Sequence, residues 1–213
     1  MEASFWHKRW ENGEIAFHES QVNPYLIAHF EKLNLPTGAR VFLPLCGKTL
    51  DIGWLLEQGY QVTGCELSPL AIQDLFNRLQ LQAEITELGE IARYSARGID
   101  IFVGDIFSLS ADQLGPVDAI YDRAALVALP AEMRRLYADH VMQLTNNAPQ
   151  LVIAYQYDQS KMAGPPHSVS DEELQRLFET VYRLQCIEST NLVDGLKGKV
   201  AAVETAMLLQ KIG

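Results

Sequence analysis

Residues 41–49 read Val-Phe-Leu-Pro-Leu-Cys-Gly-Lys-Thr, an apolar run that closes on a turn with one glycine. A second apolar run ends at Glu66, 21 residues after Leu45, the last apolar residue before the turn. In βαβ nucleotide-binding units, the acid that accepts the ribose hydroxyls stands roughly 20 residues beyond the turn. An acid before Ser68-Pro69 also suits a helix cap, but the spacing favours the ribose role. The stretch therefore predicts a nucleoside ligand.

Two familiar phosphate-binding turns need glycines that this stretch lacks. A P-loop requires a glycine five residues before Gly47, where the chain has Phe42, and a dinucleotide turn requires three glycines. The remaining interpretation is a site for a nucleoside ligand that has no diphosphate, and S-adenosylmethionine is such a ligand. The usual methyltransferase turn has an acid and three glycines, whereas here Leu43 replaces the acid and Leu45 and Thr49 replace two glycines. An ordinary strand-to-helix glycine turn therefore stays open as an alternative.

Strand-like and helix-like segments alternate along the chain, which predicts an α/β fold with a parallel sheet and helices on both faces. In such sheets, ligands bind beyond the carboxyl ends of the strands. The expected strands are 40–45, 61–66, 99–103, 117–121 and 151–155, with a closing hairpin from 182–189 and 200–209. The expected helices begin at Asn23-Pro24, near Leu50, at Ser68-Pro69, at Pro130 and at Glu172. The polar, mixed stretch 82–96 is also predicted to be helical.

Length and charge limit the classes of function. A chain of 213 residues fits one α/β domain, so residues 1–213 are predicted to form a single domain and to act as a monomer. Lys and Arg number 17 against 27 Asp and Glu, a net charge of −10 that repels a nucleic-acid backbone. No apolar stretch approaches the roughly 20 residues of a membrane span, and the N-terminus lacks the order of a signal peptide. We therefore expect a cytoplasmic protein with a small-molecule partner, and neither a nucleic-acid nor a membrane partner.

Cysteine and histidine spacing offers no metal site. Cys46, Cys65 and Cys186 are odd in number and show no CxxC pair, so reduced thiols are expected. The five histidines show neither HxH nor HExxH spacing. Cys46 lies in the glycine turn, but no base partner is identifiable, and we interpret it as a packing residue.

Charged residues follow three of the predicted strands. Asp105, after the third strand, suits either the adenine amino group or a cap of the next segment, and the sequence does not separate the two. Asp122 and Arg123 end the fourth strand, where a buried local ion pair is the simplest interpretation. An Arg at a ligand-facing strand end instead suits the carboxylate of S-adenosylmethionine or an anionic substrate, since its guanidinium presents several donors at once.

The first twenty residues are dense in aromatic side chains. Trp6, Trp10 and Phe17 stand among charged and histidine residues that do not follow one helical face. Aromatic residues usually enter a core. The polar neighbours instead favour an N-terminal flap, residues 1–22, that closes over a ligand.

With these motifs the chain resembles the thiopurine S-methyltransferase family in its bacterial form. The resemblance covers nearly the whole chain. It rests on Phe5-Trp-His-Lys-Arg-Trp-Glu-Asn-Gly-Glu-Ile-Ala-Phe-His-Glu-Ser-Gln-Val-Asn-Pro24, Val41-Phe-Leu-Pro-Leu-Cys-Gly-Lys-Thr-Leu-Asp51, Gly64-Cys-Glu-Leu-Ser68, Tyr121-Asp-Arg-Ala-Ala-Leu126 and Gly164-Pro-Pro-His-Ser-Val169. It implies the class I S-adenosylmethionine-dependent methyltransferase fold, Rossmann-like, with seven mostly parallel strands, the last one antiparallel. It also accounts for the glycine-poor turn, which the family shares.

The resemblance implies roles for individual residues. It places S-adenosylmethionine against Trp10, Leu45, Glu66 and Arg123, with Asp105 and Ile106 near the adenine. It places the substrate against Phe17 and Arg123. The animal enzymes have a second active-site arginine late in the chain, and here the corresponding stretch holds Lys197 and Lys199 as possible replacements. The implied acceptors are thiopurines and other aromatic or heterocyclic thiols, and in bacterial relatives also selenium and tellurium oxyanions, with detoxification as the purpose.

The expected reaction is an in-line transfer of a methyl group from a sulfonium to a soft nucleophile. Alignment alone supplies about 7–11 kcal/mol in such reactions, and no dedicated base is required. Arg123 is the predicted catalytic residue, because a nearby cation lowers a thiol pKa. Two alternatives stay open: a sensor that binds S-adenosylmethionine without turnover, and, disfavoured by the missing glycines, a Rossmann-type NAD oxidoreductase.

Overall fold

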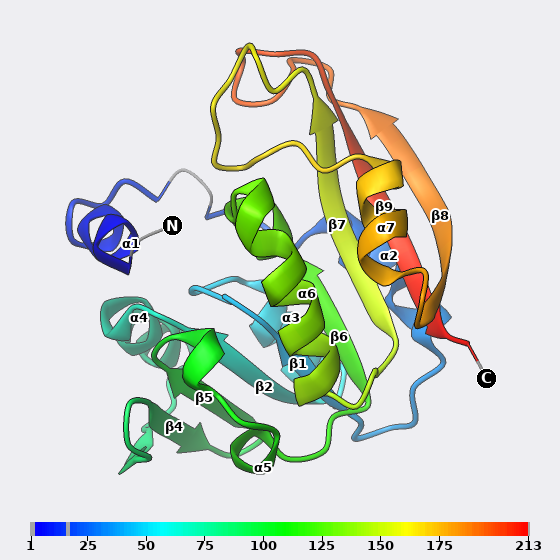
Figure 1. Cartoon of the computed structure of the whole chain (residues 1–213). Coiled ribbons are helices and arrows are strands. Elements are labelled where there is room, and N and C mark those ends of the chain that lie inside the picture. The colour runs from blue at the N-terminus through cyan, green and yellow to red at the C-terminus, as the bar shows by residue number, and fades with distance from the viewer. Residues whose placement is uncertain (1–2, 16–17, 213) are drawn as a thin grey trace.

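A computed structural model describes residues 3–15 and 18–212 of the chain (Figure 1). Within these residues, nine strands form one sheet. In spatial order they are β3 (Glu84–Glu87), β4 (Ala92–Ala96), β5 (Ile99–Val103), β2 (Gln61–Glu66), β1 (Arg40–Leu43), β6 (Ala119–Arg123), β7 (Gln150–Tyr157), β9 (Ala202–Lys211) and β8 (Tyr182–Asn191). Strands β5, β2, β1, β6 and β7 are parallel, whereas β9 pairs antiparallel with β7 and β8.

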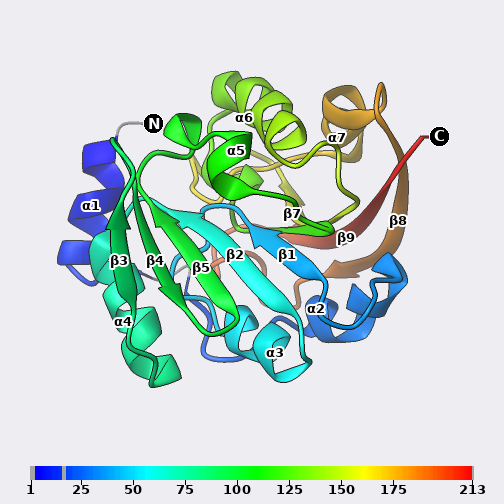
Figure 2. The ribbon, with the colours of Figure 1, turned by 90° about the horizontal axis from the view of Figure 1, so that it is seen from below.

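Helices cover both faces of the sheet (Figure 2). One face carries α2 (Pro24–His29), α3 (Asp51–Glu57) and α4 (Pro69–Leu79), and the other carries α5 (Ala111–Leu114), α6 (Ala131–Leu144) and α7 (Asp171–Phe178). The N-terminal helix α1 (Ala3–Glu11) and three short 3-10 helices, η1 (Phe30–Leu33), η2 (Ile106–Ser108) and η3 (Leu126–Ala128), complete the described elements. None of these helices is both long and apolar enough to cross a bilayer.

Alternation along the central strands builds a separate apolar core on each face. On β1, Phe42 packs into the core under α6 and α7, whereas Val41 and Leu43 pack into the core over α2, α3 and α4. All three are at most 2 % exposed. Because successive strand residues point to opposite faces, a strand buried on both sides reads as a continuous apolar run. This is the pattern that the sequence shows at 41–45.

Side-chain caps fix the helices that lead into the site. The Asn23 side chain accepts the backbone N–H groups of Tyr25 and Leu26 at the start of α2, and Ser68 accepts that of Ala71 at the start of α4. Both helices have proline in their first turn, where no N–H is needed. The helix starts predicted at Asn23-Pro24 and Ser68-Pro69 are confirmed, and so is the closing hairpin of β8 and β9.

The prediction of a helix over 82–96 is wrong, because this stretch forms the antiparallel hairpin of β3 and β4. β4 pairs along β5, and Gly104 after β5 leaves room for Ile91, since a Cβ on Gly104 would lie 2.5 Å from its side chain. The polar composition of the stretch reflects its place at the sheet edge, where β3 has one neighbour. The hairpin also explains why the described sheet has nine strands rather than the seven expected. The α/β class I fold is otherwise confirmed.

Candidate active site

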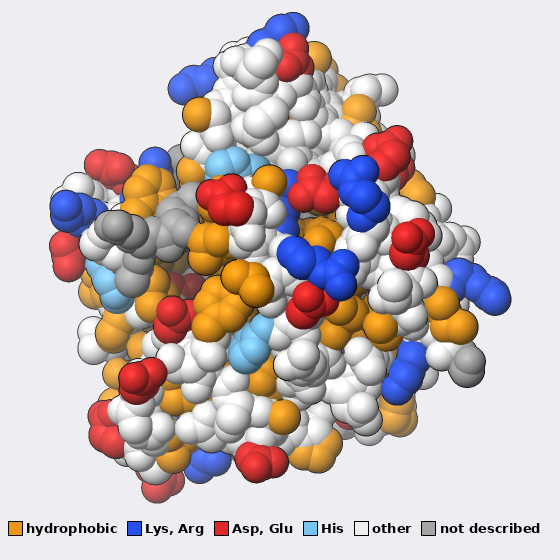
Figure 3. Space-filling model, in the orientation of Figure 1, with side chains coloured by type: hydrophobic (Ala, Val, Ile, Leu, Met, Phe, Trp, Pro, Cys, Tyr) orange, Lys and Arg blue, Asp and Glu red, His pale blue; other side chains and the backbone are white. Residues whose placement is uncertain are grey.

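A cavity of about 390 Å³ opens at the carboxyl ends of β1, β2, β5 and β6. Its walls also include α1, the start of α6, the loop after β7 and the loop between β8 and β9. Figure 3 shows hydrophobic side chains gathered beside α1, where the surface is hollowed. The lining residues are Trp6, Arg9, Trp10, His18, Glu19, 45–49, 66–67, 104–107, 123–124, 127–129, Met133, Tyr155, Pro165, Pro166, Leu196 and Lys197.

Glu66 joins the end of β2 to the glycine turn. Its Oε2 accepts the backbone N–H of Gly47 at 2.8 Å, and its Oε1 accepts that of Ser68 at 2.8 Å. The side chain is 6 % exposed, and burial raises its pKa while these backbone donors lower it. A carboxylate has about four acceptor positions, more than these backbone N–H groups fill, so acceptor capacity remains for a hydroxyl donor in the cavity. This geometry fits a ribose diol.

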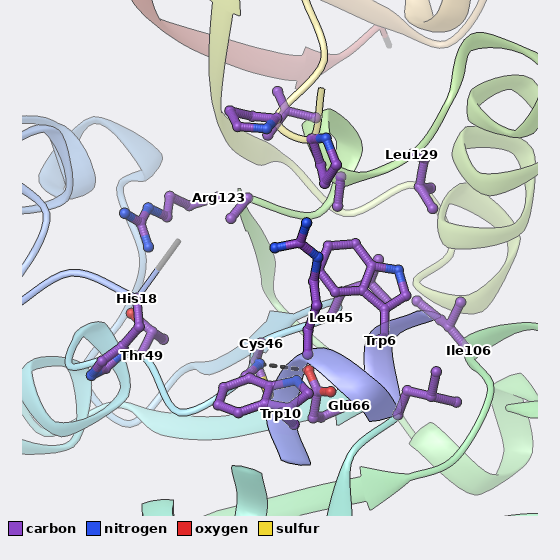
Figure 4. Close-up of a pocket in the computed structure, with 18 of the residues that line it drawn as sticks. Trp6, Trp10, His18, Leu45, Cys46, Thr49, Glu66, Ile106, Arg123 and Leu129 are labelled. Atoms are coloured by element: carbon purple, nitrogen blue, oxygen red, sulfur yellow. Dashed lines mark hydrogen bonds between the residues drawn. The ribbon is translucent and has the colours of Figure 1, made fainter. Parts of the chain in front are cut away.

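Trp10 covers the glycine turn from α1 (Figure 4). A Cβ on Gly47 would lie 3.3 Å from the Trp10 ring, and Gly47 has φ +53°. Both the close approach of the ring and the positive φ favour glycine at this position. Trp10 is 6 % exposed, and the Lys48 ammonium lies 5.7 Å from its ring centroid. Leu45, before the turn, also has a positive φ, +46°, although it carries a side chain. The turn is thus held in a conformation that ordinary sequence propensities do not favour.

Figure 4 shows Ile106 and Arg123 on opposite sides of the cavity, and Asp105, which precedes Ile106 in the chain, also lines it. The Asp105 Oδ1 accepts the backbone N–H of Phe107 at 3.0 Å, so Asp105 caps η2 and lines the cavity as well. Ile106 is 4 % exposed, and its carbonyl oxygen lies 2.7 Å from His140 Nε2. Both interpretations of Asp105, cap and ligand contact, are compatible with this position.

Arg123 brings a buried cation into the cavity. Its side chain is 9 % exposed, and its Nη2 lies 3.2 Å from Glu19 Oε1. The local ion pair with Asp122 is not formed, because Asp122 accepts the Tyr137 hydroxyl at 2.6 Å and the backbone N–H of Leu126 at 3.0 Å. Neighbouring strand residues point to opposite faces, which separates the two side chains.

The loop after β7 and the β8–β9 loop close the remaining side. The Lys197 ammonium donates to the Pro165 carbonyl at 2.7 Å, and the Tyr157 hydroxyl donates to the Pro166 carbonyl at 2.6 Å. Both prolines line the cavity, as do Leu196 and Lys197. Lys199 is not among the residues that line it. Of the two lysines considered as replacements for a second arginine, Lys197 is therefore the one at the site.

The structure brings together Trp10, Leu45, Glu66, Asp105, Ile106 and Arg123 around one cavity, whereas Phe17 lies outside the described residues. Sequence reasoning missed Arg9, His18, Glu19, Leu129, Met133 and Tyr155 as lining residues. Tyr155 had a usable signal, because it ends a predicted strand. Glu19 and His18 reach the site only through the path of the chain after α1, which no local pattern specifies.

Cys46 packs rather than reacts. It is 8 % exposed, and burial raises the pKa of its thiol well above the ordinary range, with the Glu66 charge adding to the effect. A thiol of this kind is protonated at neutral pH and is a poor nucleophile. Among the described residues, no three His, Cys, Asp or Glu side chains form a group that suits a metal ion.

Comparisons with known proteins point to one family. A family model described as thiopurine S-methyltransferase (TPMT) matches residues 1–210. The chain is 50 % identical to a thiopurine S-methyltransferase of Xanthobacter autotrophicus, over 99 % of this chain and 100 % of the relative. It is 49 % identical to one of Teredinibacter turnerae, over 99 % and 98 % of the two chains.

Solved structures share the fold at low identity. The 1,6-didemethyltoxoflavin-N1-methyltransferase of Burkholderia thailandensis, solved with S-adenosylhomocysteine, superposes with a TM-score of 0.66 at 15 % identity, covering 98 % of this chain and 87 % of that one. The N-methyltransferase NodS of Bradyrhizobium japonicum, also solved with S-adenosylhomocysteine, gives 0.64 at 12 % identity, covering 96 % and 98 %. These likenesses establish the architecture of an S-adenosylmethionine-dependent methyltransferase.

Proposed function

The chain belongs to the thiopurine S-methyltransferase family and uses S-adenosylmethionine, and we propose that it methylates the sulfur of thiopurines and of other aromatic or heterocyclic thiols. The observation that carries this proposal is a buried guanidinium, Arg123, in a cavity whose other walls are largely apolar. Leu129, Met133, Pro165 and Pro166 supply apolar surface for an aromatic ring. Such a cavity suits a flat acceptor that presents one soft, negatively charged atom.

The cofactor fits the residues at the carboxyl ends of β1, β2 and β5. We propose that the free acceptor positions of Glu66 receive the ribose hydroxyls, while Trp10 and Leu45 enclose the ligand over the turn. Asp105 and Ile106 would then face the adenine, and Arg123 would meet the carboxylate at the other end. S-adenosylmethionine supplies the methyl group there as an activated sulfonium.

The protein's own contribution is alignment, exclusion of water and support of the acceptor anion. Arg123 stabilises the thiolate form of the acceptor, because a cation at close range lowers a thiol pKa. Its 9 % exposure strengthens this effect, since water screens a buried charge less than an exposed one. The apolar walls keep the thiolate free of a tight hydration shell and in line with the methyl carbon. Alignment of this kind is worth about 7–11 kcal/mol.

One experiment tests the proposal and its alternatives together. The purified protein is incubated with S-adenosylmethionine and, in parallel, with a mercaptopurine, thiophenols, selenite and tellurite, and S-adenosylhomocysteine is quantified by mass spectrometry. Turnover with thiols supports the proposal, and turnover with selenite or tellurite extends it to those oxyanions. Binding of S-adenosylmethionine without any turnover would instead favour a sensor, and NADH binding in a fluorescence titration would favour an oxidoreductase.

We also propose that residues 1–22 act as a flap in a single-domain monomer. Trp6, Trp10, His18 and Glu19 from this segment line the cavity. All three cysteines are free, which fits a reducing compartment such as the cytoplasm, and detoxification is the role we assign there. Gel filtration combined with light scattering tests the monomer, and protease protection of the N-terminal segment by S-adenosylhomocysteine tests the flap.

A further inference from the structure

Glu19 is the one described carboxylate that forms a direct ion pair with the active-site guanidinium. Its Oε1 lies 3.2 Å from Arg123 Nη2, and both residues line the cavity. The Glu19 side chain is 57 % exposed, whereas that of Arg123 is 9 % exposed. Because Glu19 is largely exposed, it can leave Arg123 without becoming a buried, unpaired charge, and an acceptor anion can then take its place beside the buried cation.

Two further acids, Asp51 and Glu204, interact with Arg123 through their charges, and Asp51 is held in place. Asp51 accepts the backbone N–H of Asn23 at 2.9 Å through Oδ1 and the Tyr121 hydroxyl at 3.1 Å through Oδ2. It is 1 % exposed and so cannot turn away. The hydrogen bond to Asp51 anchors Asn23, which lies four residues beyond Glu19. Glu19 can therefore move away from Arg123 without any change in α2.

The neighbouring histidine does not take over the pairing. Burial, and then the charges of Arg78, Lys48 and Arg123, lower the pKa of His18 below its ordinary value. His18 is therefore mostly neutral at pH 7, and Arg123 is the cation to which the Glu19 carboxylate responds. Figure 4 places Arg123 and His18 on the same side of the cavity, away from Ile106.

We propose that Glu19 determines acceptor specificity, as an internal anion that occupies Arg123 and selects against acceptors that carry a carboxylate in addition to the thiol. This inference rests on the proposed function. A thiolate needs the cation only at its sulfur, whereas a second anion on the ring must compete with Glu19 and is repelled by it. Like charges brought together at a binding site reduce affinity and so define specificity.

Two chromophoric thiols make the test direct. 4-Nitrothiophenol and 5-mercapto-2-nitrobenzoate both have a nitro group para to sulfur, so both are thiolates at pH 7, and they differ only by the carboxylate. In each reaction the thiolate sulfur bonds to the methyl carbon, the carbon–sulfonium bond breaks and its electron pair stays on the sulfur of S-adenosylhomocysteine. The thiolate absorbance is lost on methylation, so kcat/KM is read continuously.

Three proteins are compared at about 0.15 M salt: the wild type, Glu19→Gln and Glu11→Gln. Glu11 is exposed at the end of α1 and does not line the cavity, so its variant controls for the change in net charge. We expect Glu19→Gln to raise kcat/KM for the carboxylated thiol about fivefold relative to 4-nitrothiophenol, and Glu11→Gln to leave that ratio unchanged. Calorimetric titration measures the affinity of the same proteins for S-adenosylhomocysteine. It tests whether Glu19 competes instead with the cofactor carboxylate for Arg123.

The outcomes are distinct. A ratio that rises in Glu19→Gln, with unchanged S-adenosylhomocysteine affinity, supports the assignment, and a ratio that falls overturns it. An unchanged ratio overturns the assignment of Glu19, whether or not the affinity for S-adenosylhomocysteine rises. In that case, turnover of 4-nitrothiophenol by the wild type still supports the proposed function. No turnover of either thiol by the wild type overturns both.

Discussion

The Glu66 carboxylate accepts the backbone N–H of Gly47 at 2.8 Å and so ties the end of β2 to the turn that follows β1. The two residues are 19 positions apart in the sequence. Their contact supports the role we propose for Glu66, because the same carboxylate orients the turn and lines the cavity in which the ribose would lie. Turn and acid therefore act as one unit.

Glu66→Gln is expected to lower the affinity for S-adenosylhomocysteine by about 1.5–3 kcal/mol, the value of hydrogen bonds to a charged group. A carboxamide has one oxygen, so either the Gly47 or the Ser68 N–H loses its acceptor and meets an NH₂ group. Isothermal titration calorimetry measures the loss. Glu87→Gln, on the exposed edge strand β3, is the matched control, and equal affinities for the two variants would remove Glu66 from the cofactor site.

Gly47→Ala is expected to affect binding as well as stability. Gly47 and Gly59 both have positive φ, +53° and +84°, so alanine destabilises either position by about 1 kcal/mol. A Cβ on Gly47 also meets the Trp10 ring at 3.3 Å, whereas one on Gly59 meets nothing within 4 Å. We expect Gly47→Ala alone to weaken S-adenosylhomocysteine binding about tenfold, or ~1.4 kcal/mol. Urea unfolding and calorimetry separate the two effects, and equal binding by both variants would contradict the role of Trp10.

The sheet was predictable where burial is complete. Strands such as β1 and β2 read as apolar runs because both of their faces are covered, and the caps at Asn23 and Ser68 mark the following helices. The β3–β4 hairpin was not predictable in this way. Glu84–Glu87 lies at the sheet edge with Ile85 54 % exposed, so its composition carries neither a strand period nor an apolar face.

The site was predictable from strand ends and not from contacts across the chain. Glu66 follows from spacing alone, since the spacing is a property of one βαβ unit. The Arg123–Glu19 pair joins residues more than 100 positions apart, and only the path of the N-terminal segment brings them together. Lys197 likewise reaches the cavity through a loop whose shape depends on a hydrogen bond to Pro165.

Lys197→Ala is expected to raise the KM for a thiol acceptor and to lower kcat/KM about tenfold. Lys197 lines the cavity and holds the Pro165 carbonyl at 2.7 Å, so its loss removes a cation and loosens the wall on the substrate side. Lys199→Ala removes the same charge from a neighbouring position outside the cavity and is expected to stay within about twofold of wild type. Steady-state kinetics with 4-nitrothiophenol distinguish the two lysines, and similar losses in both variants would mean that net charge alone matters.

Asp122→Asn is expected to change how stability depends on pH. Asp122 is 2 % exposed, and burial raises its pKa from 3.8 to about 6, although the Tyr137 hydroxyl and the backbone N–H groups of Leu126 and Ala125 lower it. Because the folded-state pKa exceeds the unfolded value, the folded protein binds the extra proton between these pH values. Its contribution to stability is full below about pH 4 and is lost as the pH rises through about 6.

The stability of the wild type relative to Asp122→Asn should therefore fall between pH 4 and 7, by an amount on the order of 2–3 kcal/mol. Urea unfolding at several pH values measures both proteins, and the other titrating groups cancel in the difference. Asp112→Asn, in the exposed first turn of α5, serves as the control and should show no such trend. A difference between wild type and Asp122→Asn that stays constant with pH would mean that Asp122 is ionised throughout, with its three donors fully offsetting the burial of its charge.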